Sequence, residues 1–254
     1  MERKDFLKAF VTAAAAGPIL IDACKKDSTT SAATSSTTTT ATTTTTSTTT
    51  DSNTGCSVTP TETEGPYPYV GGEATNPLNR SDITGGMTGI PLTLNIIVTN
   101  TNSNCAVVSN ARVDIWHCNK DGYYSGYASQ PGYLGTESYV GLTWLRGYQT
   151  TDTNGTAKFT SIYPGWYTGR ATHIHFEIYV NSVLKNTTQI CFPDATNTTV
   201  YASSLYSAHG ANPIINTADS IFGDSATDLA KELITLSGSV TDGYTGTVTI
   251  GLAL

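Results

Sequence analysis

Basic side chains are scarce in this 254-residue chain. It has 13 Lys and Arg residues against 20 Asp and Glu residues, which gives a formal net charge of −7. Binding to nucleic-acid phosphates needs basic patches, so this balance argues against a nucleic-acid partner. The chain also lacks an apolar run of 18 residues, which argues against a membrane-spanning helix.

Stretches with helical periodicity are also few, whereas Gly, Thr and Tyr are abundant. This composition predicts a mainly β domain. Alternating or β-branched patterns predict strands at residues 91–100, 111–116, 145–151, 156–162, 173–180, 188–192 and 248–252. The best helix candidate is 225–236, where Ser225-x-x-Asp228 can cap the first turn. We find no internal repeat and no second domain.

The five cysteines are Cys24, Cys56, Cys105, Cys118 and Cys191. Cys24 belongs to the N-terminal segment discussed next. The other four are an even number in a chain with an apparent export signal, so up to two disulfides can form, with three connectivities. The sequence does not choose among them, and Cys118 can equally be a buried thiol.

Residues 1–24 have the pattern of an export signal. Arg3-Lys4 gives a positive start, residues 9–21 are mostly apolar, and Ala23 precedes Cys24. This resembles a bacterial lipoprotein signal, in which Cys24 is lipidated, although Asp22 is not the usual residue there. Residues 3–8 also resemble a twin-arginine motif with Lys in place of the second Arg. The alternatives are an ordinary signal peptide or a buried helix that carries a cysteine.

Residues 25–55 are almost all Thr, Ser and Ala, a composition that cannot bury a core. We expect a disordered tether there and a folded domain at 56–254. The expected location is the bacterial cell envelope, either lipid-anchored or periplasmic or on the outer surface. Contact with a membrane is expected only through a lipid at Cys24.

Two of the four histidines, His173 and His175, lie two residues apart in the predicted strand 173–180. Side chains two apart in a strand point to the same face, so the two imidazoles can share one metal ion. A His-x-His pair can equally be an ordinary strand feature. The 14 tyrosines offer phenolate oxygens, a less common kind of ligand.

Four motifs follow one another along the chain: Thr63-Glu64-Gly65-Pro66-Tyr67; Val113-Asp114-Ile115-Trp116-His117 with Gly122-Tyr123-Tyr124-Ser125; residues 146–152; and residues 163–176. In these motifs the sequence resembles the intradiol ring-cleavage dioxygenases, the family of catechol 1,2-dioxygenase and protocatechuate 3,4-dioxygenase. The resemblance covers roughly residues 60 to 200. It implies a β-sandwich of mixed and antiparallel strands, with long loops and one or two short helices.

The resemblance implies a non-haem Fe(III) held by Tyr124, Tyr167, His173 and His175. Tyr123 is the register alternative for the first ligand, and Tyr127 is a further one. Two imidazoles and two phenolates form a hard, anionic donor set that favours Fe(III) over Zn(II) or Cu(I).

The resemblance also implies an activity. A catechol and O2 are the expected small-molecule partners, and the ring opens between its two hydroxyl-bearing carbons to a muconic acid. Tyr167 is expected to leave the metal and help take up protons. Arg170 is expected to stabilise negative charge on the ring, and Gln189 to orient groups beside it. For Arg170 the structural alternative is an ion pair with an acid such as Glu177.

The substrate is less defined. Residues 193–222 carry no basic cluster for a ring carboxylate, which favours unsubstituted, alkyl- or hydroxy-substituted catechols over protocatechuate. Arg80, Arg112 or Arg146 can still reach such a carboxylate if the chain folds them into the pocket.

Two other functions fit parts of the sequence. The chain can be a surface-tethered β-sandwich binding module for an aromatic or polysaccharide ligand, with a metal site that is not catalytic. It can also be a zinc hydrolase that uses His173 and His175, but the sequence shows no convincing third ligand with a paired general base. The colour of the purified protein separates the leading hypothesis from the binding module.

Overall fold

The computed structural model describes residues 57–254. The predicted signal (1–24), the predicted tether (25–55), Cys24 and Cys56 lie outside the described residues. Within the described part, no helix is both long enough and apolar enough to cross a membrane.

One layer of the fold is a four-stranded antiparallel sheet in the order β6-β3-β8-β9. Its strands are β6 (Arg146–Thr150), β3 (Arg112–Trp116), β8 (His173–Val180) and β9 (Val183–Cys191). In β8, Ile174, Phe176 and Ile178 belong to the main hydrophobic core. Because side chains alternate along a strand, the histidines of β8 lie on the opposite face of this sheet.

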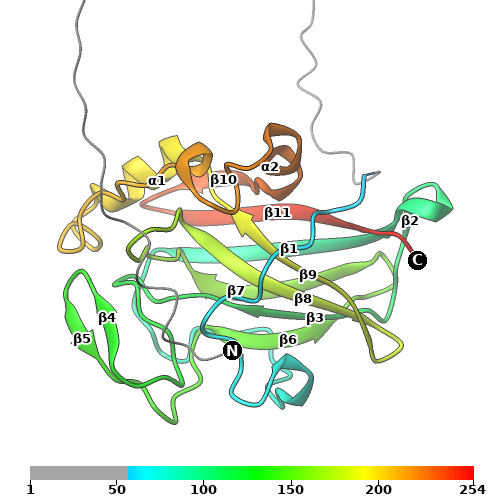
Figure 1. The fold of residues 1–254 in the computed structure, drawn as a ribbon, viewed down its shortest axis with the longest axis horizontal. Helices are drawn as coiled ribbons and strands as arrows, with labels where there is room; N and C mark the ends of the chain where they lie inside the picture. The colour runs from blue at the N-terminus through cyan, green and yellow to red at the C-terminus, as the bar shows by residue number, and fades with distance from the viewer. Residues whose placement is uncertain (1–56) are drawn as a thin grey trace, which may run out of the picture. The chain divides into compact units, whose positions relative to one another are not determined.

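The second layer is a five-stranded sheet in which β10, β11, β1 and β2 follow one another and β7 also pairs with β1 (Figure 1). Its strands are β10 (Thr235–Ser239), β11 (Gly243–Leu252), β1 (Pro91–Asn100), β2 (Ala106–Val107) and β7 (Thr156–Ile162). β1 pairs with β11 in parallel and with β7 antiparallel. A separate hairpin joins β4 (Gln130–Gly132) to β5 (Gly135–Glu137).

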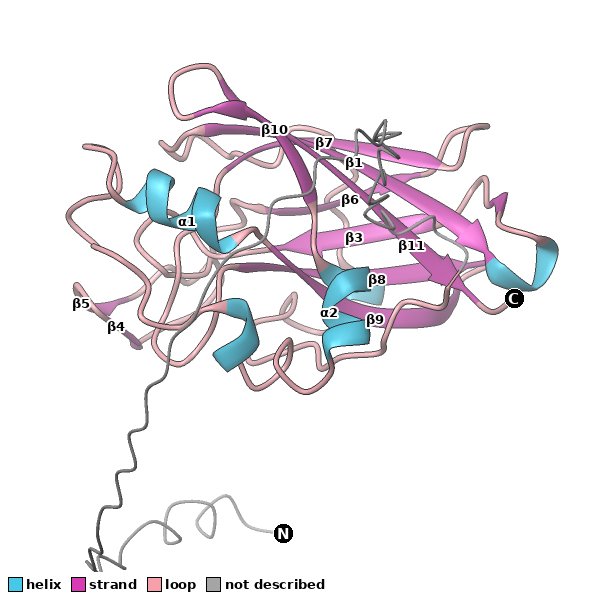
Figure 2. Ribbon diagram, turned by 90° about the horizontal axis from the view of Figure 1, so that it is seen from above, coloured by secondary structure: helices cyan, strands magenta, loops and turns pink. Residues whose placement is uncertain are grey.

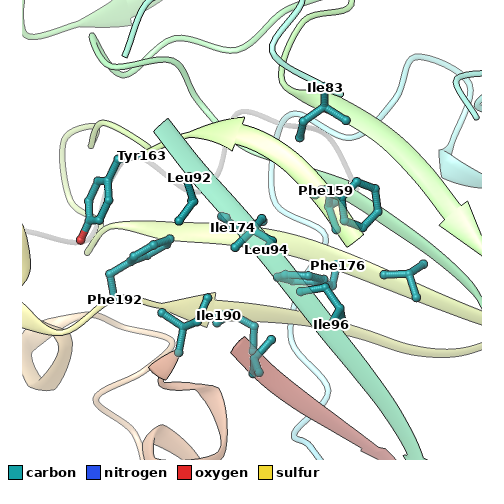
Figure 3. Close-up of a cluster of buried hydrophobic side chains, with 14 of the residues drawn as sticks. Ile83, Leu92, Leu94, Ile96, Phe159, Tyr163, Ile174, Phe176, Ile190 and Phe192 are labelled. Carbon is teal, nitrogen blue, oxygen red and sulfur yellow. The ribbon is translucent and has the colours of Figure 1, made fainter. Parts of the chain in front are cut away.

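The main core lies between the two sheets. Figure 3 shows Leu92, Leu94 and Ile96 of β1 facing Ile174 and Phe176 of β8. All five side chains are almost completely buried, as expected for the inner faces of two packed sheets. The predicted β-sandwich is therefore confirmed.

The strand predictions at 91–100, 156–162 and 173–180 match the bounds of β1, β7 and β8. Those at 111–116 and 145–151 match β3 and β6 to within one residue at an end. The prediction at 188–192 was too short because β9 begins at Val183, just after a turn at Asn181 and Ser182, both with positive φ. β11 likewise begins earlier than predicted, at Gly243.

The two α-helices of the described part are α1 (Asp194–Tyr201) and α2 (Ala226–Glu232) (Figure 2). Ser225 caps α2 as predicted, since its side chain accepts a hydrogen bond from the Asp228 N–H. The predicted extension of this helix to residue 236 is wrong. The Ile234 N–H instead donates to the Cys191 carbonyl of β9, and the chain enters β10. α1 was not predicted, because its Thr-rich sequence has no apolar periodicity and no capping side chain.

Two of the cysteines are free and buried, namely Cys118 and Cys191, whereas Cys105 is disulfide-bonded. The possibility of two disulfides among Cys56, Cys105, Cys118 and Cys191 is therefore not realised. Burial raises the pKa of the Cys118 thiol to about 12, so it stays protonated as a small apolar side chain.

An N-terminal arm, residues 57–80, covers the outer face of the four-stranded sheet. Its backbone is fixed by three N–H groups: Glu62 donates to Thr187, Thr59 to Gly251 and Arg80 to Tyr148. This arm makes the histidine face of β8 a buried surface as well, because every residue from His173 to Tyr179 is buried. His173 and His175 therefore lie between the arm and the four-stranded sheet.

Glu232, at the end of α2, predicts a pH dependence of stability. Its carboxylate is fully buried and has no hydrogen-bond partner among the described residues. Burial and the nearby Glu62, Asp224 and Asp228 raise its pKa from 4.5 to about 8. Between these two pH values the folded state keeps a proton that the unfolded state has lost, so stability falls as pH rises, by up to about 1.4 kcal/mol per pH unit.

We expect Glu232→Gln to reduce the fall in Tm between pH 5 and pH 9, measured by thermal unfolding. Glu137→Gln, at an exposed position of β5, is the matched control and should leave the pH profile unchanged. A Glu232→Gln profile that is parallel to wild type contradicts the assignment.

Candidate metal centre

The two histidines of β8 bring their Nε2 atoms to 3.1 Å from each other. His173 Nδ1 lies 2.6 Å from the Ala171 carbonyl oxygen, which can only accept, so Nδ1 carries the proton and Nε2 has the free lone pair. Burial, followed by the charge of Arg170, lowers the pKa of His173 to about 3. Burial also lowers the pKa of His175. Both imidazoles are therefore neutral, which is the form that binds a metal.

Neighbouring residues fix the orientation of His175. Its ring stacks on Trp116 of β3, with centroids 5.0 Å apart and an interplanar angle of 7°. On the arm, Gly65 has φ of +72°, and a Cβ there would lie 2.7 Å from His175 Cε1. Only glycine allows this close approach without strain. The Nδ1 atom of His175 has no hydrogen-bond partner among the described residues.

Two tyrosines complete the cluster from two different loops. The Tyr167 hydroxyl lies 3.0 Å from His173 Nε2, and the Tyr124 hydroxyl lies 3.2 Å from His175 Nε2. The register alternatives point elsewhere, because Tyr123 donates to the Gly135 carbonyl and Tyr127 to the Pro68 carbonyl. Of the three tyrosines considered for the first ligand, Tyr124 alone is brought to the histidines.

Both phenols are protonated in the absence of a cation. Burial raises the pKa of Tyr124 above its ordinary value. Burial also raises the pKa of Tyr167 to about 12, although the nearby charge of Arg170 acts in the opposite direction. A metal cation at this position would reverse this balance by stabilising the phenolates.

The donor set fits a hard metal ion. Two Nε2 atoms and two phenol oxygens follow one another at 3.0–3.2 Å in a buried cluster. Within residues 57–254 no group of three or more His, Cys, Asp or Glu side chains could hold a metal, so a metal at the two histidines would need the phenol oxygens as its further protein donors. Imidazole with phenolate oxygen suits Fe(III), whereas the absence of thiolate makes Zn(II) or Cu(I) less favourable.

The loops that carry the two tyrosines are joined to each other. Asn119 Oδ1 accepts hydrogen bonds from the backbone N–H groups of Asp121 and Tyr123, and the Asn119 carbonyl accepts from the Gly165 N–H. At Gly122, with φ of +87°, a Cβ would lie 2.2 Å from the Trp166 carbonyl oxygen. This contact sets the separation between the Tyr124 loop and the Tyr167 loop.

Arg170 and Gln189 lie side by side next to the cluster. Arg170 Nη2 donates to Gln189 Oε1 at 2.6 Å, and Gln189 Nε2 donates to the Thr63 carbonyl at 2.8 Å. Arg170 does not pair with Glu177, the partner considered from the sequence. It pairs with Asp219 at 2.9 Å, while Glu177 interacts with Tyr179 and Thr187.

Sequence reasoning missed four residues of the site: Gly65, Tyr67, Asn119 and Asp219. Tyr67 of the arm stacks on Tyr124, with ring centroids 4.7 Å apart, and its edge meets Tyr167. Gly65 and Tyr67 lie within a motif that was recognised but given no role. Nothing in the sequence near Asn119 or Asp219 indicates a contact with the cluster.

A cavity of about 300 Å³ lies away from the four donor atoms. It is lined by Tyr69, Val70, Gly126, Val140, Gly141, Leu142, Thr143 and Arg146. Arg146 is committed to other groups, because it donates to the Ser125 hydroxyl, the Ser125 carbonyl and the Tyr67 carbonyl. We therefore place the candidate site at the four converging donor atoms and not at this cavity, whose lining contains none of them.

Comparisons with known proteins agree with the family resemblance that the sequence motifs indicated. A family model described as a dioxygenase matches residues 63–209, more than half of the chain. A search of curated proteins found no match.

Among solved structures, an intradiol ring-cleavage dioxygenase from Tetranychus urticae is 29% identical, with a TM-score of 0.68, and the match covers 78% of this chain and 95% of that one. The dioxygenase domain of a carbohydrate-binding fusion protein from a Streptomyces species is 23% identical, with a TM-score of 0.53 and coverage of 78% and 99%. Hydroxyquinol 1,2-dioxygenase from Pseudomonas putida is 16% identical, with a TM-score of 0.53 and coverage of 77% and 66%. The last two show similarity of fold alone.

The contact at Gly65 gives a testable prediction. Gly65→Ala places a methyl group against His175, so we expect it to lower Tm and to weaken metal binding, both measured on the purified domain. Gly86→Ala is the matched control, because Gly86 also has positive φ (+82°) but nothing within 4 Å of the added Cβ. The control should lose only about 1–2 kcal/mol from backbone strain and keep its metal affinity. Equal effects of the two substitutions contradict the proposed packing.

Proposed function

The chain belongs to the intradiol ring-cleavage dioxygenase family, and on that premise we propose that it uses a non-haem Fe(III) and O2 to open a catechol ring to a muconic acid. The bond that breaks is the ring carbon–carbon bond between the two hydroxyl-bearing carbons. The observation that carries the proposal is the convergence of two Nε2 atoms and two phenol oxygens at 3.0–3.2 Å.

Tyr124, Tyr167, His173 and His175 are the residues that would hold the iron. When bound, Fe(III) supplies a Lewis acid that binds the catechol oxygens and favours their deprotonation. The two histidines serve as neutral ligands, since burial keeps them uncharged. The tautomer of His173 is set by the Ala171 carbonyl, which leaves Nε2 free for the metal.

The two tyrosines have different environments, which suits different roles. Tyr124 is completely buried beneath Tyr67, whereas Tyr167 is only partly buried and lies near Arg170. We assign to the Tyr167 oxygen, in the phenolate form that a bound metal cation would stabilise, the uptake of a proton from the substrate, because Tyr167 is the more accessible of the two tyrosines.

Arg170 is assigned the role of stabilising negative charge that develops on the ring. The Arg170 guanidinium is partly buried, so it acts in a medium of lower dielectric constant than water, where its interaction with an anion is stronger. Gln189 holds this guanidinium from one side and is itself bound to the Thr63 carbonyl of the arm. Gln189 therefore acts by orienting Arg170.

The charged groups favour a catechol without a ring carboxylate. Arg112 is paired with Asp114, Arg146 with groups of Ser125 and Tyr67, and Arg80 with the carbonyls of Thr143 and Arg146. The three arginines that were candidates for binding a carboxylate are thus engaged elsewhere. Arg170 itself is neutralised in part by Asp219.

The proposal includes export to a bacterial cell envelope. It rests on the sequence of residues 1–24 and on the Thr/Ser-rich residues 25–55. With a lipid at Cys24, the tether would hold the enzyme near a membrane surface.

An absorption spectrum with an iron assay tests the function. For the domain from residue 55 onward, loaded with Fe(III), we expect a broad visible band from phenolate ligands that shifts on anaerobic addition of catechol. Tyr124→Phe and Tyr167→Phe should each weaken or shift this band. Tyr123→Phe is the matched control and should leave it unchanged, since that hydroxyl is bound to Gly135.

A protein that stays colourless after loading with Fe(III) contradicts the proposal and favours the binding module instead. A coloured protein that binds catechol but does not open the ring in air would also favour the module. Ring opening by the wild type, followed by the absorbance of the product, supports the dioxygenase.

Substrate preference provides a separate test. We expect kcat/KM for catechol or 4-methylcatechol to exceed that for protocatechuate by at least about tenfold, because the three candidate arginines of the described residues, Arg80, Arg112 and Arg146, are engaged by other groups. An attractive partner would be worth roughly 1.5–3 kcal/mol. Steady-state rates at matched pH and ionic strength measure the ratio, and a preference for protocatechuate contradicts this assignment.

A further inference from the structure

Asp219 has an environment that its position in the sequence does not suggest. It follows the short 3-10 helix Asn216–Ala218, and its side chain is completely buried. One carboxylate oxygen, Oδ2, accepts from Arg170 Nε at 2.9 Å and from the Ala171 N–H at 2.6 Å. The other, Oδ1, accepts from the Ile221 N–H at 2.8 Å and from the Phe222 N–H at 3.4 Å.

These contacts fix the guanidinium of Arg170 at two points. Nε is bound to Asp219 and Nη2 is bound to Gln189 Oε1. A guanidinium is planar, so two directed hydrogen bonds define both its position and its plane. Asp219 and Gln189 come from segments far apart in the chain, which places the cation between two independently anchored side chains.

The same carboxylate also holds the residue that orients a histidine of the cluster. Asp219 Oδ2 binds the Ala171 N–H, and the Ala171 carbonyl lies 2.6 Å from His173 Nδ1. On the Oδ1 side, Asp219 ties down the segment of Phe222, whose ring centroid lies 6.3 Å from that of His173. One buried acid therefore contacts both the Arg170 side chain and the start of the histidine strand.

We propose that Asp219 is a positioning residue of the active site, which aims the Arg170 guanidinium at the substrate and fixes the Ala171 carbonyl that orients His173. Its assignment to ring cleavage rests on the proposed function. It acts through Arg170 and Ala171 and does not itself touch the reacting atoms.

The chemistry of the contacts explains why a carboxylate is needed there. All four partners of Asp219 are N–H donors, and a carboxylate can accept from all of them. An asparagine of the same shape would direct an NH2 group at two of these donors. Asp219→Asn therefore tests the charge and the acceptors with little change in volume.

The experiment compares Asp219→Asn with wild type in the iron-loaded domain. We expect kcat per bound iron to fall by about 10–100-fold with a much smaller change in KM, because the Arg170 charge acts mainly on the transition state. We expect Fe(III) affinity to fall as well, because His173 loses its fixed orientation. In an Arg170→Ala background, Asp219→Asn should still lower Fe(III) affinity but should reduce kcat per bound iron by less than about threefold.

A second readout does not depend on activity. In the iron-free wild type the Arg170 Nε–H should give a slowly exchanging NMR signal, assigned by its loss in Arg170→Lys. The signal should shift and exchange faster in Asp219→Asn. Asp114→Asn is the matched control, since it breaks another arginine–carboxylate pair whose carboxylate is buried, at 2.7 Å, away from the four donors. It should lower Tm but leave the Arg170 signal and kcat per bound iron unchanged.

An Asp219→Asn variant that retains the wild-type Arg170 signal overturns the proposal. An Asp219→Asn variant in which only Tm falls, as expected for the Asp114→Asn control, also overturns the proposal. If the wild type binds Fe(III) but opens no catechol ring, the proposed function fails, and the NMR signal and Fe(III) affinity still decide whether Asp219 positions these groups.

Discussion

Burial of β8 on both faces is the constraint on which the site depends. One face of the strand fills the sandwich core, and the other is covered by residues 57–80. Because the histidine face is dry, protonated imidazoles would lose their hydration without compensation, and both histidines stay neutral. Among the described residues His175 Nδ1 has no hydrogen-bond partner, and the low dielectric constant of this buried region strengthens the interactions of the Arg170 charge.

The cluster is assembled from segments that are distant in the sequence, and each is fixed by contacts outside the four donor atoms. Gly65 brings the arm against His175, Gly122 brings one tyrosine loop against the other, and Asp219 ties the segment after Asn216–Ala218 to the start of β8. The donors can therefore be held in place before any ion binds. Such preorganisation avoids the cost of reorganising the site during the reaction.

The sequence predicted most of the β framework because alternation of apolar and polar residues is a local signal. It placed β1, β7 and β8 with the right bounds and grouped His173 with His175. It left Tyr123 and Tyr124 undecided, since loop side chains have no fixed period. Only tertiary contacts separate the two: the Tyr123 hydroxyl binds the Gly135 carbonyl, and the Tyr124 hydroxyl lies beside His175. Asp219 was missed for a related reason: its two partners beside the cluster, Arg170 and Ala171, lie 49 and 48 residues away, and no spacing rule links them. The predicted end of α2 was wrong because a tertiary contact ends the helix: the Ile234 N–H donates to the Cys191 carbonyl of β9, and the chain continues into β10.

The parallel pairing of β1 with β11 joins residues 91–100 to residues 243–252. During synthesis β1 leaves the ribosome about 150 residues before its partner, so one of its edges has no strand to pair with for most of that time. Pairing between such distant segments closes a long loop and is slow compared with hairpin formation. β7, the antiparallel partner of β1, and the four-stranded sheet can form earlier, whereas the five-stranded sheet is complete only when β11 pairs with β1. Completion of the five-stranded sheet therefore depends on residues 243–252, which lie far from β1 along the chain.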